Sequence, residues 1–192
     1  MKATMTFLVL LAVACVMPFT NLQAAPPAIG DLIADLRFKD IRALPRSLND
    51  LGAKKAYVLV FTTTSCPLVR RSIPKLIDLD TRYAPQDVQI VAVNVGAEDT
   101  IRDMAAQAID LGAAFPFVKD SNLSCARSLG VTRTPEVVVL DANKKLVYRG
   151  RIDDQLRLGG ARPEPTRRDL EEAIRDLLEG RPVAVSETPV DG

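Results

Sequence analysis

Residues 57–69 read Tyr57-Val58-Leu59-Val60-Phe61-Thr62-Thr63-Thr64-Ser65-Cys66-Pro67-Leu68-Val69, and the pattern changes in the middle of this run. The residues from Ala56 to Phe61 are continuously apolar, which is typical of a strand buried on both faces. Pro67 suits the first turn of a helix, where its missing N–H costs no hydrogen bond. Cys66 therefore stands at a predicted strand-to-helix junction, where the helix N-terminus favours a thiolate over a thiol.

A reactive thiol at this place usually works with a second thiol three residues later, but that position is Val69. The only other cysteine in the predicted domain is Cys125. We consider two roles for it: a distant resolving thiol for Cys66, or a small core residue that pairs with Leu129 on a short helix. Thr63 and Arg70 are candidates to support a Cys66 thiolate, although loop chemistry and a solvated helix face explain them equally well.

Strand-like and helix-like segments alternate along the rest of the chain. We expect strands at 56–61, 88–95, 137–140 and 145–152, and helices from Pro67, over 100–111 after Asp99 as cap, over 122–129, and from a Thr166 cap to Gly180. A loose hairpin over 32–48 and an extended piece at 115–118 complete the pattern. This order predicts an α/β fold in which helices cover a central mixed sheet, a three-layer sandwich.

The N-terminal residues resemble an export signal. Residues 1–25 combine a positive start at Lys2, an apolar stretch at 7–16 and small residues before Pro26, which predicts a cleaved signal peptide and a periplasmic or secreted protein. The apolar stretch is shorter than the roughly 20 residues of a bilayer span, so we expect no stable membrane anchor. A lipoprotein cleaved at Cys15 is the less favoured alternative. The domain is then 26–180, followed by an irregular tail at 181–192 that shows no packing pattern.

The composition excludes several classes of function. The chain has 25 basic and 24 acidic residues, so its charge gives no reason to expect a nucleic-acid partner. It has no histidine, which excludes imidazole metal ligands, axial haem histidines and a Cys/His dyad within the chain. Two cysteines do not form a four-sulfur metal site alone. We therefore expect no cofactor and no metal.

Three offsets from Cys66 resemble those of the thioredoxin superfamily. Phe61 lies five residues before the cysteine, Pro74 lies eight after it, and Thr134-Pro135 precedes a later strand. The resemblance implies a thioredoxin-like three-layer sandwich with a central mixed β-sheet. It also implies a cis peptide bond at Thr134-Pro135, with Pro135 facing the thiol. Thr134 and Pro135 thus join Cys66 as predicted catalytic-site residues.

More closely, the chain resembles a bacterial peroxiredoxin-like redoxin subgroup with a single active-site cysteine. Three segments carry this resemblance: 65–69, 134–141 and 146–154. Members of the subgroup often continue a little beyond the position of Gly192 with a Gly-Cys pair, which implies a further thiol there. The chain also departs from its relatives. Peroxiredoxins proper carry their cysteine at the position of Val69, and thioredoxins bury an acid at that of Val60.

These observations support three hypotheses of function. The first is an exported thiol–disulfide oxidoreductase, in which Cys66 reacts with a disulfide-bearing protein and an external thiol reductant resolves the product. The second is a peroxiredoxin-like peroxidase with an antioxidant role, in which Cys66 attacks peroxide and a small thiol recycles it. The third is a redox-inactive module that binds proteins through the groove around Pro135.

Overall fold

A seven-stranded mixed sheet forms the centre of the computed structural model, which describes residues 25–157 and 159–191. The strand order is β2-β1-β5-β4-β3-β6-β7. The strands are β1 Arg37–Asp40, β2 Pro45–Ser47, β3 Ala56–Thr62, β4 Val88–Asn94, β5 Phe117–Lys119, β6 Glu136–Asp141 and β7 Leu146–Gly150. The predicted signal peptide lies outside the described residues, apart from Ala25.

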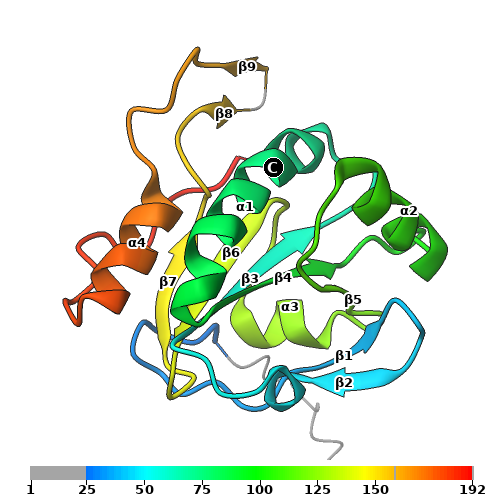
Figure 1. Cartoon of the computed structure of the whole chain (residues 1–192), viewed down its shortest axis with the longest axis horizontal. Helices are drawn as coiled ribbons and strands as arrows, with labels where there is room; N and C mark the ends of the chain where they lie inside the picture. The colour runs from blue at the N-terminus through cyan, green and yellow to red at the C-terminus, as the bar shows by residue number, and fades with distance from the viewer. Residues whose placement is uncertain (1–24, 158, 192) are drawn as a thin grey trace, which may run out of the picture.

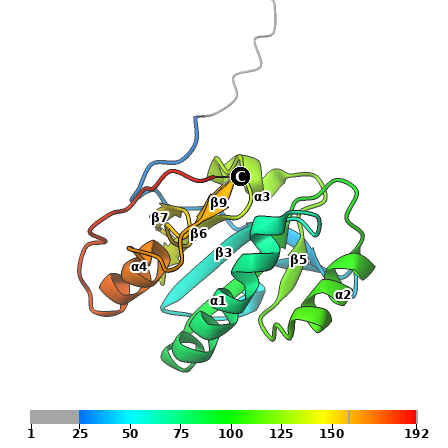
Figure 2. The same cartoon turned by 90° about the horizontal axis from the view of Figure 1, so that it is seen from above.

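Four α-helices cover the sheet, and Figures 1 and 2 show them on its two faces. They are α1 Pro67–Tyr83, α2 Ile101–Leu111, α3 Ser124–Leu129 and α4 Asp169–Leu178. Two 3-10 turns lie at Leu48–Leu51 and Ala84–Gln86, and a small hairpin pairs β8 Leu156–Arg157 with β9 Gly160–Ala161. Helices α1, α2 and α4 pack on one face and α3 packs on the other. The predicted three-layer α/β sandwich is confirmed.

Strand β3 lies in the interior of the sheet, parallel to β4 and antiparallel to β6. Its side chains alternate between the two layers of core: Val58 and Val60 pack toward α1, whereas Leu59 and Phe61 pack toward α3. Both faces of β3 are therefore apolar and buried, which explains the continuous apolar sequence. The last residues of β3, and the loop from β3 to Cys66, therefore lie at the carboxyl edge of the sheet.

The start of the last helix was predicted wrongly. Helix α4 begins at Asp169 with Arg168 as its N-cap, not with a cap at Thr166. The Thr166 amide donates instead to a carboxylate oxygen of Asp154 at 2.7 Å, and the Arg167 amide donates to the same oxygen at 3.0 Å. These bonds hold Thr166 in the loop, because its polar groups are already engaged by a residue twelve positions earlier.

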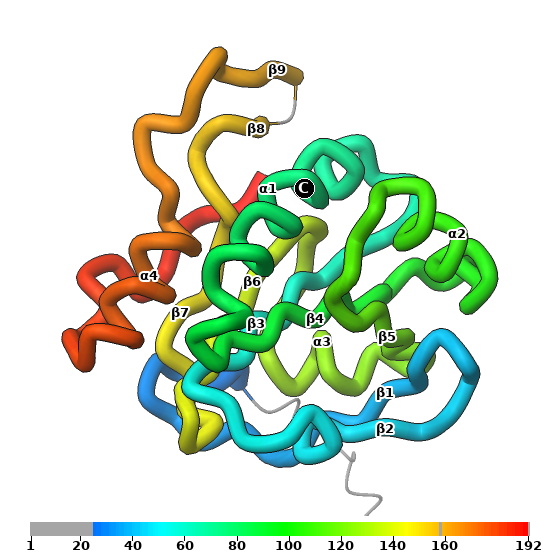
Figure 3. Tube along the Cα trace, in the orientation of Figure 1, coloured from blue at the N-terminus to red at the C-terminus, as the bar shows by residue number. Residues whose placement is uncertain are grey.

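The C-terminal tail has no regular secondary structure, but it packs against the edge of the sheet. The Arg149 amide of β7 donates to Ser186 O at 2.9 Å, and the Thr188 amide donates to Arg149 O at 3.1 Å. The Thr188 hydroxyl lies 2.8 Å from the hydroxyl of the fully buried Tyr148. A Cβ at Gly150 would come closer than 3.0 Å to Thr188. The tail thus covers the edge of β7, and Figure 3 shows it running back from α4 toward the start of α1.

Candidate active site

Cys66 is the N-cap residue of α1, with the extended backbone angles φ −74° and ψ 119°. Pro67 follows as the first helical residue, and the Arg70 amide closes the first turn by donating to Cys66 O at 3.2 Å. The helix begins here because Pro67 fixes its own φ and needs no N–H partner in the first turn. The thiol is half-buried and packs against the α1 side of the core.

The loop before β6 meets this thiol. The Thr134-Pro135 peptide bond is cis, as the resemblance implied. The Cys66 thiol donates to Thr134 O at 3.5 Å. Glu136 is buried, and its carboxylate accepts hydrogen bonds from the Thr132 amide at 3.1 Å and the Arg133 amide at 3.3 Å. The structure thus brings together the three predicted residues Cys66, Thr134 and Pro135.

A polar network that sequence reasoning missed fixes the loop before Cys66. Thr64 donates to the Asp99 carboxylate through its amide, at 2.8 Å, and through its hydroxyl. Asn94 Nδ2 donates to the same carboxylate at 2.7 Å, and Lys119 Nζ donates to Asn94 Oδ1 at 2.7 Å. We call Thr64, Asn94, Asp99 and Lys119 the Asp99 network. The predicted cap of α2 is corrected, because Thr100 caps that helix and Asp99 serves the thiol loop.

The network forms because three parallel strands end at one edge of the sheet. Strands β3, β4 and β5 end at Thr62, Asn94 and Lys119. Gly96 lies against the Asp99 carboxylate so closely that a Cβ there would clash with it. The polar residue at the end of each of these strands could have been noticed in the sequence. The position of Asp99 could not, because no fixed spacing relates this loop residue to the strand ends.

The negative charge of Asp99 and the positive charge of Lys119 stabilise each other in the network. Burial opposes the ionised form of Asp99, but the hydrogen bonds from Thr64 and Asn94 and the positive charge of Lys119 outweigh it, so the pKa of Asp99 is lowered. Burial lowers the pKa of Lys119, while the negative charges of Asp99 and Asp120 partly offset that effect. Asp99 is therefore a carboxylate that the fold keeps ionised.

Replacing Asp99 with Asn is expected to lower the free energy of unfolding by about 1–3 kcal/mol at pH 7, because charge-assisted hydrogen bonds are lost. The pKa of Asp99 in the folded protein lies below its unfolded value of about 3.9. The stabilisation is therefore complete above about pH 5, and it is lost as the pH falls through the pKa of the folded protein. Urea unfolding of both proteins at pH 7 and pH 3 measures the difference. Glu98→Gln, at the exposed neighbouring residue, is the control. A difference that is equal at both pH values would contradict this role.

Cys125 does not lie with Cys66. It packs on the α3 face of the sheet, whereas Cys66 packs on the α1 face. It is 2% exposed, and its thiol donates to Arg37 O at 3.2 Å. Burial, together with the nearby Asp120 carboxylate, raises the pKa of Cys125 to about 12. In this arrangement Cys125 is a core residue.

The remaining candidates contribute less to the site. Thr63 is partly buried, but its side chain makes no hydrogen bond to any described residue, in contrast to Thr64. Arg70 is exposed one helical turn after Cys66. Val60 and Val69 are buried in the apolar core under α1. The positions that hold an acid and a second thiol in thioredoxins are therefore filled with hydrocarbon.

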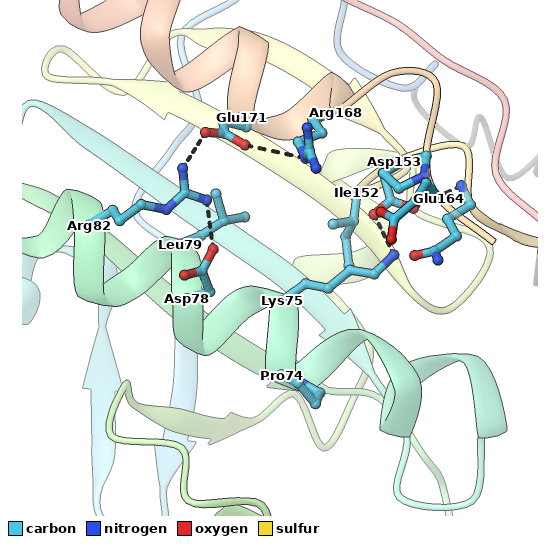
Figure 4. Close-up of a pocket in the computed structure, with 12 residues that line it drawn as sticks. Pro74, Lys75, Asp78, Leu79, Arg82, Ile152, Asp153, Glu164, Arg168 and Glu171 are labelled. Carbon is cyan, nitrogen blue, oxygen red and sulfur yellow. Dashed lines mark hydrogen bonds and ion pairs between the residues drawn. The ribbon is translucent and has the colours of Figure 1, made fainter. Parts of the chain in front are cut away.

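Two cavities flank α1, and they differ in character. The one next to the site, which we call the cis-proline cavity, is bordered by Leu68, Pro135, Leu156, Arg157 and Val190, among others. The larger one, of about 370 Å³, lies between α1 and α4 and begins two turns beyond Cys66. Figure 4 shows that its charged residues are mostly paired: Lys75 with Asp153, and Arg82 with Asp78 and Glu171. Cys66 lines neither cavity, but Pro135, which follows the Thr134 carbonyl that the thiol contacts, lines the first.

Within residues 25–157 and 159–191, no three acidic or cysteine side chains gather in a way that would hold a metal ion. No helix in the same part of the chain combines the length and the apolar character needed to cross a bilayer.

A single thiol at a helix start, facing a cis-proline across the edge of a mixed sheet, defines a protein of the thioredoxin-like class. The comparisons agree, because the fold matches the thioredoxin domain of a thiol-disulfide oxidoreductase from Bacteroides vulgatus with a TM-score of 0.60 at 15% identity, over 79% of this chain and 99% of that one. The chain belongs to the Redoxin family, whose model matches residues 30–165.

Two further relatives are more similar in sequence. The thiol-disulfide oxidoreductase ResA of Geobacillus thermodenitrificans is 29% identical over 119 residues, which cover 62% of this chain and 67% of that protein. A hypothetical protein of Sinorhizobium meliloti has a crystal structure that matches with a TM-score of 0.79 at 28% identity, over 88% of this chain and 93% of that one.

Proposed function

We propose that the protein is an exported thiol–disulfide oxidoreductase that uses Cys66 as its single reactive thiol. The observation that carries the proposal is the 3.5 Å contact between the Cys66 thiol and Thr134 O, beside the cis bond to Pro135, on a half-buried cysteine at a helix start. The relative from Geobacillus, named a thiol-disulfide oxidoreductase, supports the same chemistry. Export is supported by residues 1–25, and residues 26–180 would form the mature domain.

The proposed reaction has two steps. The Cys66 thiolate attacks one sulfur of a substrate disulfide, a Cys66–substrate disulfide forms, and the other substrate sulfur leaves as a thiolate that takes up a proton. An external thiol then attacks the mixed disulfide at the Cys66 sulfur or the substrate sulfur. Val69 supplies no thiol and Cys125 lies on the other face of the sheet. With a substrate whose leaving thiol is removed, the first product is therefore expected to persist until an external thiol is added.

A reaction with a disulfide peptide in the absence of other thiols tests this proposal. Intact-mass measurement should show one peptide attached to each protein molecule, peptide mapping should place it on Cys66, and millimolar glutathione should release it. A protein that forms no adduct under these conditions does not have the proposed function, and it fits the binding-module hypothesis instead.

Peroxide reduction is the second candidate, and the Redoxin match favours it. There, the thiolate attacks one peroxide oxygen, the O–O bond breaks, and Cys66 becomes a sulfenic acid while water or an alcohol leaves. Leu59 stands where peroxiredoxins carry a proline, which counts against this reaction. Labelling of Cys66 with dimedone after peroxide treatment would detect it. Rapid peroxide consumption without any peptide adduct would favour the peroxidase.

A further inference from the structure

Three exposed arginines lie on the elements that build the site, and they come from three different parts of the chain. Arg70 lies one turn into α1, Arg133 directly precedes the cis-proline loop, and Arg157 on β8 borders the cis-proline cavity. None of the three forms an ion pair with any residue of the described part of the chain. We call them the site arginines. Their positive charges are therefore available to a partner.

Most acidic groups around the same cavity are already engaged. Asp153 pairs with Lys75, and Asp154 pairs with Arg162. Arg151, which also borders the cavity, pairs with Asp169, and Glu136 accepts backbone hydrogen bonds. The exposed acids nearby are Asp191, on the tail, and Glu98, next to the Asp99 network. Among these five exposed side chains, the three site arginines outnumber the two acids by one.

The tail shows how a chain segment lies on this surface. Val190 and Asp191 border the cis-proline cavity together with Pro135 and Arg157. Arg133 Nη1 donates to Val190 O at 3.3 Å. The tail segment therefore already contacts the loop that carries Arg133, and the contact is made by a backbone oxygen of the kind any peptide offers.

We propose that the site selects disulfide substrates whose cysteine is flanked by acidic residues. This inference rests on the proposed function, because it names the substrate class of that same site. Opposite charges on a partner and on a binding surface accelerate the encounter, and the effect weakens as salt screens the charges. The lining of the cis-proline cavity mixes apolar residues such as Leu68, Pro135 and Leu156 with charged ones, and Arg157 is the cation of that lining without an ion pair among the described residues, so its charge can distinguish one extended peptide from another.

Two disulfide peptides that differ only in their flanking residues, glutamate in one and lysine in the other, test the inference. We expect the acidic peptide to form the Cys66 adduct about tenfold faster or more at low ionic strength, since electrostatic steering changes association rates by 10-fold to 1000-fold. The ratio should fall toward one in 0.5 M salt, where the screening length is only a few ångströms.

Arg133→Glu and Arg157→Glu should each reduce the ratio, and the double variant should reverse it. Lys55→Glu is the matched control: it changes the same charge on an exposed residue just before β3, at the opposite end of the strand that leads to Cys66, and it should leave the ratio unchanged. Equal rates for the two peptides in the unaltered protein would overturn the inference while leaving the proposed function intact. Failure of both peptides to react would instead refute the proposed function, and the inference with it.

Discussion

Replacing Cys66 with Ser is expected to abolish adduct formation with disulfide peptides and the reduction of insulin. A serine hydroxyl is not ionised at neutral pH and does not exchange with disulfides, whereas a thiolate does. Cys66 is also the only cysteine in the described residues that is not fully buried. The rate should therefore fall to the level without protein. Intact-mass measurement and the insulin turbidity assay provide independent readouts.

The control for this variant is Cys125→Ala. Cys125 is buried on the α3 face, so its loss should leave the rate of adduct formation unchanged and cost only a modest amount of stability from the lost methylene-sized packing, about 1 kcal/mol. Undiminished activity in Cys66→Ser would refute the proposed function. A longer-lived adduct in Cys125→Ala would show that Cys125 does resolve the mixed disulfide through a conformation other than the one described here.

Replacing Val69 with Cys is expected to convert the lone thiol into a self-resolving pair. Val69 is the third residue of α1, and Cys66 is the N-cap, so the two positions lie one turn apart. A thiol held next to a mixed disulfide reacts as if its concentration were far above the millimolar level of an external reductant, because the encounter no longer costs translational freedom. The peptide adduct should therefore disappear, and a disulfide between Cys66 and the new thiol should replace it.

The comparison needs a variant that alters packing without adding a thiol. Val69 is 1% exposed, and Val69→Ser puts a hydroxyl of nearly the same size in place of the new thiol, without sulfur chemistry. Its adduct should persist as it does in the unaltered protein. Because a buried thiol resists ionisation, resolution by the new cysteine should be faster at pH 9 than at pH 7. An adduct in Val69→Cys that lasts as long as that in Val69→Ser would contradict the one-turn geometry.

Local patterns in the sequence predicted most of the fold. The apolar runs that contain Val58 and Val91, and the proline and glycine signals around them, are short-range features that reflect burial and backbone geometry directly. The junction at Cys66 follows from them. The cis bond at Thr134-Pro135 required the family resemblance, since an X–Pro bond in general is mostly trans and no local pattern specifies the cis form.

Long-range polar contacts were the part that no local pattern revealed. The Asp99 carboxylate meets Thr64, 35 residues earlier, and Thr166 meets Asp154, twelve residues earlier. The sequence of the tail shows no packing pattern, yet the Thr188 hydroxyl lies 2.8 Å from the Tyr148 hydroxyl and the Thr188 amide donates to Arg149 O. Such contacts depend on where the strands end in the folded protein, so they cannot be predicted from the spacing of residues along the chain.

The sequence by itself determined that a lone thiol stands between a buried strand and a helix, and that Val69 occupies the position of the usual second thiol. Both follow from neighbouring residues, because the apolar pattern of a strand and the residues that begin a helix are local features. Only the tertiary structure decided what surrounds that thiol. It placed Cys125 and Cys66 on opposite faces of the sheet, and it placed Arg157 on the cis-proline cavity and Arg133 in contact with Val190, which borders the same cavity. The physical reason is that side chains distant in sequence become neighbours only when strand order and helix packing fix them in space.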